Sequence, residues 1–84
     1  MHDLEVSQKA DKIFKKLSKK DSVQLKVIKR RIDEILENPE HYKPLKGDMH
    51  GARRVHIDKS FVLVYEIERN TVRILDYDHH DKIY

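Results

Sequence analysis

The feature that most constrains the fold is a change of hydrophobic period near the middle of the chain. Before Pro39 the apolar residues recur at helical spacing, and after residue 52 they follow the spacing of extended strands. Asn38-Pro39 marks the end of the helical part, because proline disfavours the helical conformation in the residue before it. The sequence therefore predicts an α+β protein in which the helices precede most of the sheet.

The helical part predicts two amphipathic helices. Apolar residues at helical spacing run over residues 8–19, directly behind Ser7, a residue type that caps helices. A second helical pattern continues to residue 37, and Asp21 or Ser22 can cap its start. Joined by so short a break, the two helices are expected to form an antiparallel hairpin with one apolar face.

Four segments predict strands. Residues 2–6 alternate polar and apolar side chains, and RRVHI at 53–57 does the same. Residues 61–67 are apolar nearly throughout, as in a central strand that is covered on both faces. A turn at 68–70 leads to the last strand, 71–77. The order β-α-α-β-β-β predicts an antiparallel meander of the last three strands, with the helical hairpin packed on one face.

Size and composition favour a single small domain, 1–84, in a reducing compartment. The 84 residues include no cysteine, so no disulfide framework is expected. No apolar run approaches the roughly 18–20 residues of a membrane span, and the N-terminus does not resemble a signal peptide. We therefore expect a cytoplasmic protein. The net charge of +3 is modest and indicates an anionic partner only if the cations gather on one face.

Cations and a histidine fall on the face of the predicted sheet that the helices leave uncovered. In the strand 53–57, Arg54 and His56 should point away from the core. The loop before this strand adds Lys43 and Lys46. Such a face would suit an anionic ligand.

The C-terminal segment RILDYDHHDKIY adds the densest cluster of titratable residues. If the last strand lies beside Arg54 and His56, then His79, His80 and Tyr84 can converge on the same face. These residue types suit RNA cleavage without a metal ion. Histidine transfers protons near neutral pH, tyrosine can stack on a base or donate a proton, and cations stabilise the charge gathered on a phosphate.

The residues alone leave other interpretations open. The C-terminal segment also contains potential metal ligands, namely Asp78, His79, His80 and Asp81. Adjacent residues of a strand point in different directions, however, and no cysteine or spaced histidine pattern supports a metal site. His56 is also compatible with an ordinary surface position, and Tyr84 with terminal packing. No phosphate-binding glycine loop or serine or cysteine nucleophile motif is present.

The second half of the chain resembles a known family. PLKGDMHGARRVHIDKSFVLVYEI, followed by a hairpin, a strand and HHDKIY, resembles the RelE/ParE superfamily of toxins from type II toxin–antitoxin modules. The shared pattern is P-L-x-G, R-x-x-x-I, L-V-Y-E-I and a closing H-x-x-x-Y, and the helical pair extends the resemblance over nearly the whole chain. It implies a RelE-like fold and a ribosome-dependent mRNA endonuclease, or, in the ParE branch, an inhibitor of DNA gyrase.

Within the superfamily, the site residues resemble the YafQ-like branch. His56 and His80 stand where that branch has histidines, and Tyr84 stands at its closing aromatic position. Lys43 aligns roughly with a further loop histidine of the branch. Val62 departs from the RelE branch, many members of which have an arginine there. Gyrase inhibitors of the superfamily generally lack such a histidine and tyrosine set, which favours the nuclease.

The resemblance implies a catalytic set of His56, His80 and Tyr84, with no metal or other cofactor. The two histidines would transfer protons while the neighbouring 2′-OH attacks, leaving a 2′,3′-cyclic phosphate. The implied phosphate- and RNA-binding residues are Arg54, Lys46, Lys43, Arg53, Phe61 and His79. The implied partners are a small RelB-like antitoxin, the ribosome and mRNA in its A site. An inactive toxin that only binds its antitoxin is the remaining alternative, because Val62 replaces the arginine.

Overall fold

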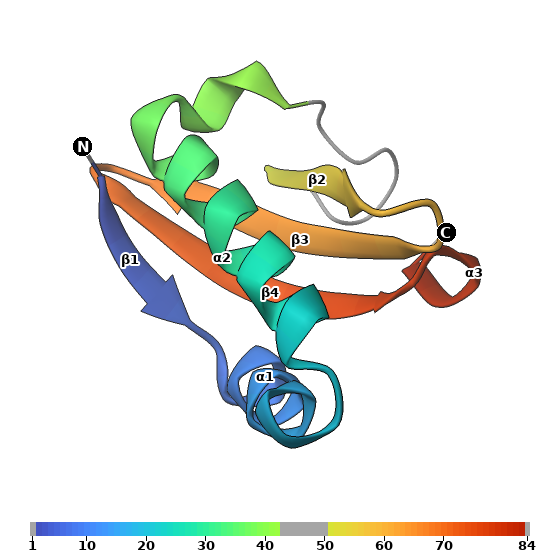
Figure 1. The fold of residues 1–84 in the computed structure, drawn as a ribbon. Coiled ribbons are helices and arrows are strands. Elements are labelled where there is room, and N and C mark those ends of the chain that lie inside the picture. The colour runs from blue at the N-terminus through green and yellow to red at the C-terminus, as the bar shows by residue number, and fades with distance from the viewer. Residues whose placement is uncertain (1, 43–50, 84) are drawn as a thin grey trace.

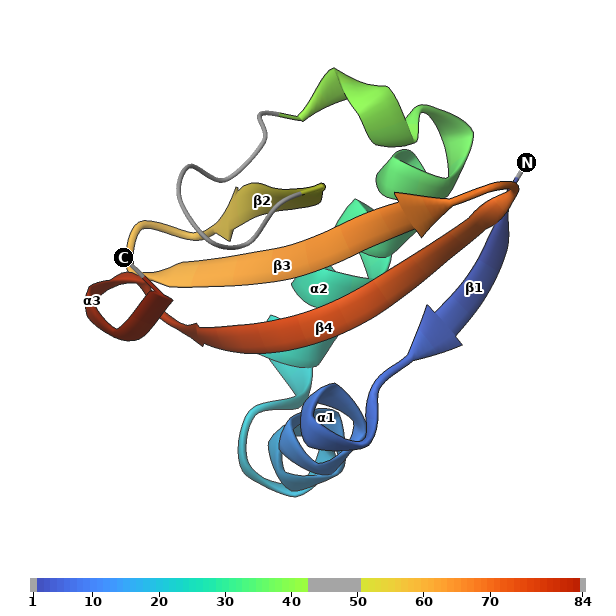
Figure 2. The same cartoon turned by 180° about the vertical axis from the view of Figure 1, so that it is seen from behind.

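A computed structural model describes residues 2–42 and 51–83, which form a four-stranded sheet with two long helices on one face (Figures 1 and 2). The elements in chain order are β1 (Asp3–Val6), α1 (Gln8–Lys20), α2 (Ser22–Glu37), the 3-10 helix η1 (Pro39–His41), β2 (Ala52–Ile57), β3 (Phe61–Glu68), β4 (Thr71–His79) and α3 (His80–Ile83). The predicted α+β class and the predicted element order are confirmed. The short helices η1 and α3 were not predicted.

The sheet has the strand order β1-β4-β3-β2. Strands β2, β3 and β4 form the predicted antiparallel meander, and β1 pairs with β4 in parallel. Strands β1 and β2 are therefore the two edges. Figure 1 shows α2 in front of the sheet, and Figure 2 shows the opposite face, with β3 and β4 toward the viewer. In the described part of the chain, no helix has the length and apolarity needed to cross a membrane.

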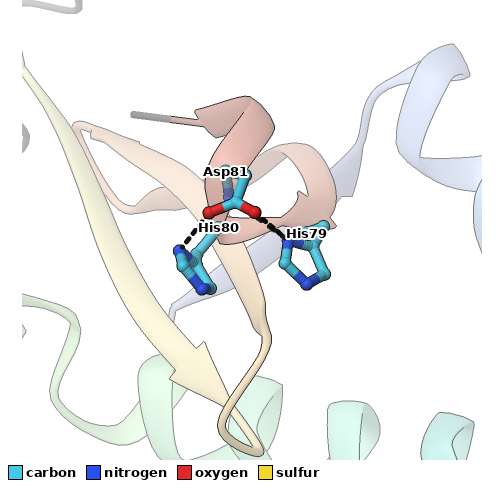
Figure 3. A group of neighbouring side chains, drawn as sticks. All are labelled: His79, His80 and Asp81. Carbon is cyan, nitrogen blue, oxygen red and sulfur yellow. Dashed lines mark hydrogen bonds and ion pairs between the residues drawn. The ribbon is translucent and has the colours of Figure 1, made fainter.

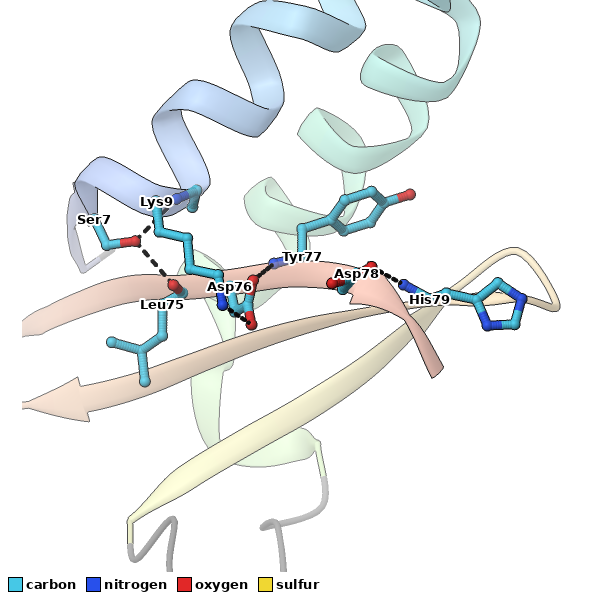
Figure 4. Close-up of polar contacts among 8 residues, drawn as sticks. Ser7, Lys9, Leu75, Asp76, Tyr77, Asp78 and His79 are labelled. Atoms are coloured by element: carbon cyan, nitrogen blue, oxygen red, sulfur yellow. Dashed lines mark hydrogen bonds and ion pairs between the residues drawn. The ribbon is translucent and has the colours of Figure 1, made fainter. Parts of the chain in front are cut away.

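The start of α1 is attached to β4 by polar contacts (Figure 4). Ser7 caps the helix by accepting a hydrogen bond from the Ala10 N–H at 3.1 Å, and its hydroxyl donates to the Leu75 carbonyl at 2.8 Å. One turn into the helix, Lys9 Nζ lies 2.9 Å from Asp76 Oδ2. A single serine thus ends the first strand, begins the helix and holds the helix against the sheet.

The main core lies between the helices and the sheet. Asp21 caps α2 by accepting from the Gln24 N–H at 3.0 Å, and the helix ends before Pro39 as predicted. The buried residues of this core are Ala10, Ile28, Ile32, Ile35, Leu36, Val55, Ile57, Leu63, Tyr65, Val72, Ile74 and Tyr77. Tyr65 is fully buried, and its hydroxyl donates to the Pro39 carbonyl, which joins β3 to the end of the helical part.

A β-bulge at Leu75 interrupts the last strand. Ile74 and Asp76 lie opposite consecutive residues of β3, so Leu75 is the extra residue. An extra residue inverts the alternation of side chains beyond it. Tyr77 therefore joins Ile74 in the core beneath the helices, and Asp76 and Asp78 lie on the other face of the sheet.

The face opposite the helices has a small apolar cluster of its own. Val62 and Val64 of β3 lie on this face, yet both are fully buried, with 0 % of their surface accessible to solvent. They form the cluster together with Ala52. Leu75 and Ile83 pack against this cluster, the latter from α3. The central strand is covered on both faces, as predicted. The expectation that this face is uncovered is wrong at its centre, and one reason is that α3 brings Ile83 onto it.

Candidate functional site

Two rows of side chains cross the face opposite the helices, each running from β2 through β3 to β4. The rows are Arg54–Val64–Asp76 and His56–Val62–Asp78. Arg54 and His56 therefore point away from the main core, as alternation along β2 predicts. Each row ends on a carboxylate about 10 Å from the β2 residue, since neighbouring strands lie about 4.8 Å apart. The face is consequently mixed in charge. Among the described residues, the cations toward β4 are paired with carboxylates, Lys9 with Asp76 and Arg73 with Glu5 and Glu66, and Arg54 lies at the β2 edge.

A hollow of about 450 Å³ lies at this basic edge. Its described lining combines Arg54 and His56 of β2 with residues of α2, η1 and the segment after η1: Arg31, His41, Tyr42, Arg54, Val55 and His56. Two guanidinium groups, two imidazoles and a phenol line it, and the described lining includes no carboxylate. Such a lining suits an anionic group such as a phosphate.

One wall of the hollow is held in place by an acidic residue behind it. Glu34 accepts from Arg31 Nη1 at 3.0 Å and from the Tyr42 hydroxyl at 3.2 Å. The hydrogen bond to Glu34 raises the pKa of Arg31, and burial raises the pKa of Tyr42. Both side chains therefore keep their protons over the physiological range, and the arginine remains a cation at the edge of the hollow.

Arg53 and Phe61, two of the predicted RNA-binding residues, lie on the helix side of the sheet. Arg53 Nη1 donates to the carbonyl of Tyr42 at 2.7 Å and to that of Glu40 at 3.3 Å. Phe61 stacks on Tyr77, with ring centroids 5.4 Å apart and planes 10° from parallel. The observed contacts of both residues are structural: Arg53 anchors the chain after α2, and Phe61 closes one end of the core.

His80 lies at the same end of the sheet as His56. Its backbone N–H donates to the Ser60 carbonyl at 2.8 Å, in the turn that joins β2 to β3. Its ring stacks on that of His79, with centroids 4.8 Å apart. His79 itself lies opposite Phe61 and contacts that ring edge-on. The turn thus brings the end of β2 and the start of α3 together, although they are distant in sequence.

Three predicted site residues, Lys43, Lys46 and Tyr84, lie outside the described residues. Ile83, which precedes Tyr84, packs on the valine cluster, so α3 contributes to packing more than the sequence indicates. Sequence reasoning missed Arg31, His41 and Tyr42, which line the hollow. No local pattern identifies them, because α2 and η1 reach β2 only through the tertiary fold.

Comparison with known proteins identifies the family. Residues 4–84 match the model of the family described as "ParE toxin of type II toxin-antitoxin system, parDE". A protein of Methanocaldococcus jannaschii named "Putative toxin RelE4" is 49% identical over 86 residues, which cover 100% of this chain and 92% of that protein. A match at this identity and coverage indicates common descent over the whole domain.

Solved structures share the fold at lower identity. The YoeB/ParE toxin from Agrobacterium tumefaciens superposes with a TM-score of 0.83 at 19% identity, over 93% of this chain and 98% of that one. The isolated E. coli RelE toxin gives 0.78 at 23% identity, over 94% and 84% of the two chains. E. coli YafQ gives 0.70 at 24% identity, over 100% and 99%. The chain belongs to the ParE toxin family of type II toxin–antitoxin systems, within the RelE/ParE superfamily.

Proposed function

We propose that this toxin is an endoribonuclease that cuts mRNA in the ribosomal A site without a metal cofactor. The observation that carries the proposal is the placement of Arg54 and His56 on one basic hollow, at the same end of the sheet as His80. Metal-free RNA cleavage needs a proton acceptor for the 2′-OH, a proton donor for the leaving 5′-oxygen and a cation at the phosphate. These three residues supply all of these groups.

In the proposed reaction, His56 and His80 form the proton-transfer pair. One imidazole removes the proton from the 2′-OH, whose oxygen attacks the adjacent phosphorus. The other imidazole protonates the 5′-oxygen as its bond to phosphorus breaks, leaving a 2′,3′-cyclic phosphate. Arg54 stabilises the charge on the phosphate oxygens. His79 supports the arrangement by stacking on His80.

The remaining predicted residues divide into two groups. Lys43 and Lys46 are proposed to hold the phosphate backbone, and Tyr84 to stack on or orient the scissile nucleotide, on the strength of the family pattern. Arg53 and Phe61 are engaged on the helix side of the sheet. We assign them to the support of the site rather than to RNA contact.

Primer extension on ribosome-bound mRNA tests the proposal. His56→Gln and His80→Gln should each lower the cleavage rate about 10²–10⁴-fold, the usual contribution of general acid–base catalysis. His2→Gln is the matched control, because His2 precedes β1, the sheet edge opposite β2, and does not line the hollow. Unchanged cleavage by both site variants would exclude the mechanism.

Inhibition of DNA gyrase is the second candidate function. The observation that favours it is the description of the matching family as a ParE toxin, because the ParE branch is the one that the sequence resemblance links to gyrase. Expressing the toxin in cells and following both mRNA cleavage and plasmid supercoiling separates the two functions. Loss of plasmid supercoiling while mRNA stays intact would establish gyrase as the target and reject the nuclease.

The antitoxin is proposed to bind an apolar groove beside the helical pair. The groove measures about 480 Å³ and is lined by Leu4 and Val6 of β1 together with residues of α1 and α2. Leu4 and Val6 are 43 % and 38 % exposed, on a strand at the edge of the sheet. An extended or amphipathic segment of a RelB-like partner could pair with this edge and fill the groove.

Co-expression with the neighbouring reading frame, followed by size-exclusion chromatography, tests this surface. The two proteins should co-elute, and Val6→Lys should weaken the complex because it places a charge in the groove. Val23→Lys is the matched control, since Val23 is 70 % exposed and does not line the groove. Separate elution of the wild-type proteins at low salt would contradict the proposed partner.

A further inference from the structure

The junction of β4 and α3 brings together three side chains that the active-site proposal does not use as a group. His79 is the last residue of β4, and His80 and Asp81 begin α3 (Figure 3). Within a strand, neighbouring side chains would point to opposite faces. Here the backbone changes from extended to helical between the two histidines, and their rings lie side by side, 26° from parallel. The objection that these adjacent side chains point in different directions therefore does not hold for the two histidines.

The Asp81 carboxylate lies between the two imidazoles. Its Oδ1 is 3.1 Å from His80 Nδ1, and its Oδ2 is 3.5 Å from His79 Nδ1 (Figure 3). One ligand atom from each of the three residues can be chosen so that all lie within 4.8 Å of one another. Tetrahedral zinc with bonds of 2.0–2.1 Å separates its ligand atoms by about 3.3 Å. The two nitrogen–oxygen distances lie on either side of this value.

Both the backbone and the side chain of Asp81 contact the same ring nitrogen of His79. The Asp81 backbone N–H donates to His79 Nδ1 at 3.3 Å, and the Asp81 carboxylate lies 3.5 Å from that nitrogen. An ion that this nitrogen ligates would replace the backbone hydrogen bond, because an imidazole nitrogen has one lone pair.

We propose that His79, His80 and Asp81 bind a divalent ion of the zinc type. Two imidazoles and a carboxylate are ligands that zinc accepts, with a water molecule as the fourth. The histidine side chains are 40 % and 43 % exposed, so an ion can enter from solvent. They also have room to turn from stacked to convergent planes, and the torsion involved is soft.

Bound zinc would act on this toxin as an inhibitor. Because the ion ligates His80, that imidazole could not exchange a proton with RNA. This consequence rests on the proposed nuclease mechanism, whereas binding itself does not. The two parts are therefore measured separately.

Isothermal titration calorimetry of the untagged full chain with Zn²⁺ tests the binding. One ion per chain is expected. Asp81→Asn should weaken the affinity at least about tenfold, the lower end of the effect seen even for residues that only support a ligand. Asp33→Asn and His41→Gln are the matched controls and should bind as the wild type does. Mg²⁺, which prefers oxygen ligands, should not compete.

The proposed site would be overturned if the wild type fails to bind Zn²⁺. It would also be overturned if binding is unchanged in both Asp81→Asn and the double variant His79→Gln, His80→Gln. Co²⁺ provides a second readout, because a four-coordinate site gives it an intense visible absorption that Asp81→Asn should remove. Zinc should also inhibit RNA cleavage by the wild type at concentrations that leave Asp81→Asn active. Confirmed binding without such inhibition would establish the site and count against His80 as a proton-transfer residue.

Discussion

Alkaline pH should destabilise this protein through two buried tyrosines. Tyr65 is 0 % and Tyr77 is 3 % exposed, and burial raises the pKa of each from 10.0 to about 12. Burial has this effect because the phenolate loses its hydration in the core. The Tyr65 hydroxyl donates to the Pro39 carbonyl, and the Tyr77 hydroxyl accepts from Gln24 Nε2. The donated bond favours the neutral form of Tyr65, whereas the bond from Gln24 lowers the pKa of Tyr77 and is outweighed by burial.

The sign and size of the effect follow from linkage. Below pH 10 both tyrosines are protonated in the folded and unfolded states, and their full contribution to stability is present. Between pH 10 and 12 the unfolded chain loses these protons first, so the free energy of unfolding falls as pH rises. A difference of about two pKa units corresponds to about 2.7 kcal/mol per tyrosine, or about 5 kcal/mol for both. That is comparable with the whole stability expected of a domain of this size, about 4–13 kcal/mol.

Urea unfolding at a series of pH values from 8 to 12 measures this loss, and tyrosinate absorbance reports the titration directly. Tyr65→Phe should be less stable than the wild type at pH 8 by about 1–3 kcal/mol, since the Pro39 carbonyl loses its donor. It should also lose less stability between pH 10 and 12, so the two curves should approach each other. Lysine deprotonation affects both proteins alike and cancels in the difference. Parallel curves for wild type and variant would refute the reasoning.

Three further changes test other parts of the structure. Ser7→Ala should lower the free energy of unfolding by about 1–2 kcal/mol in urea titration, because it removes the helix cap and the bond to Leu75, and an equal stability would contradict the capping role. Gly51→Ala should lower the free energy of unfolding by about 1 kcal/mol in the same assay, because Gly51 has φ +84; the added Cβ would meet no atom within 4 Å, so the cost comes from the backbone alone. Gly51→Asn should recover part of this loss, since asparagine tolerates positive φ. EDTA should leave the RNA cleavage rate of the metal-free toxin unchanged, and inhibition that a divalent ion reverses would instead indicate metal-dependent catalysis.

The helices and their ends were predictable because their signals are local. The spacing of apolar residues sets the buried face of each helix, Ser7 and Asp21 supply the caps, and Pro39 ends the second helix. Each signal acts within a few residues, so no knowledge of the tertiary fold is needed to interpret it. The face of Arg54 and His56 was predictable for the same reason, since alternation along one strand is also local.

The hollow beside β2 was only half predictable. Its β2 wall follows from alternation, but Arg31 and Tyr42 reach it from α2 and the chain after η1. Their contribution depends on how the helical pair crosses the sheet. That crossing is decided by packing between residues far apart in sequence, and no pattern in either segment records it.

The sequence by itself determined the class of fold, the order of its elements and the residue types available for chemistry. Only the tertiary structure decided the register of the last strand. The bulge at Leu75 turns Tyr77 into the core and leaves Asp76 and Asp78 on the other face. Uninterrupted alternation from Ile74 would have given the opposite result. The physical reason is that strand register depends on pairing with β3 and on burying Tyr77 beneath the helices, and these are non-local interactions whose free energy no single segment contains.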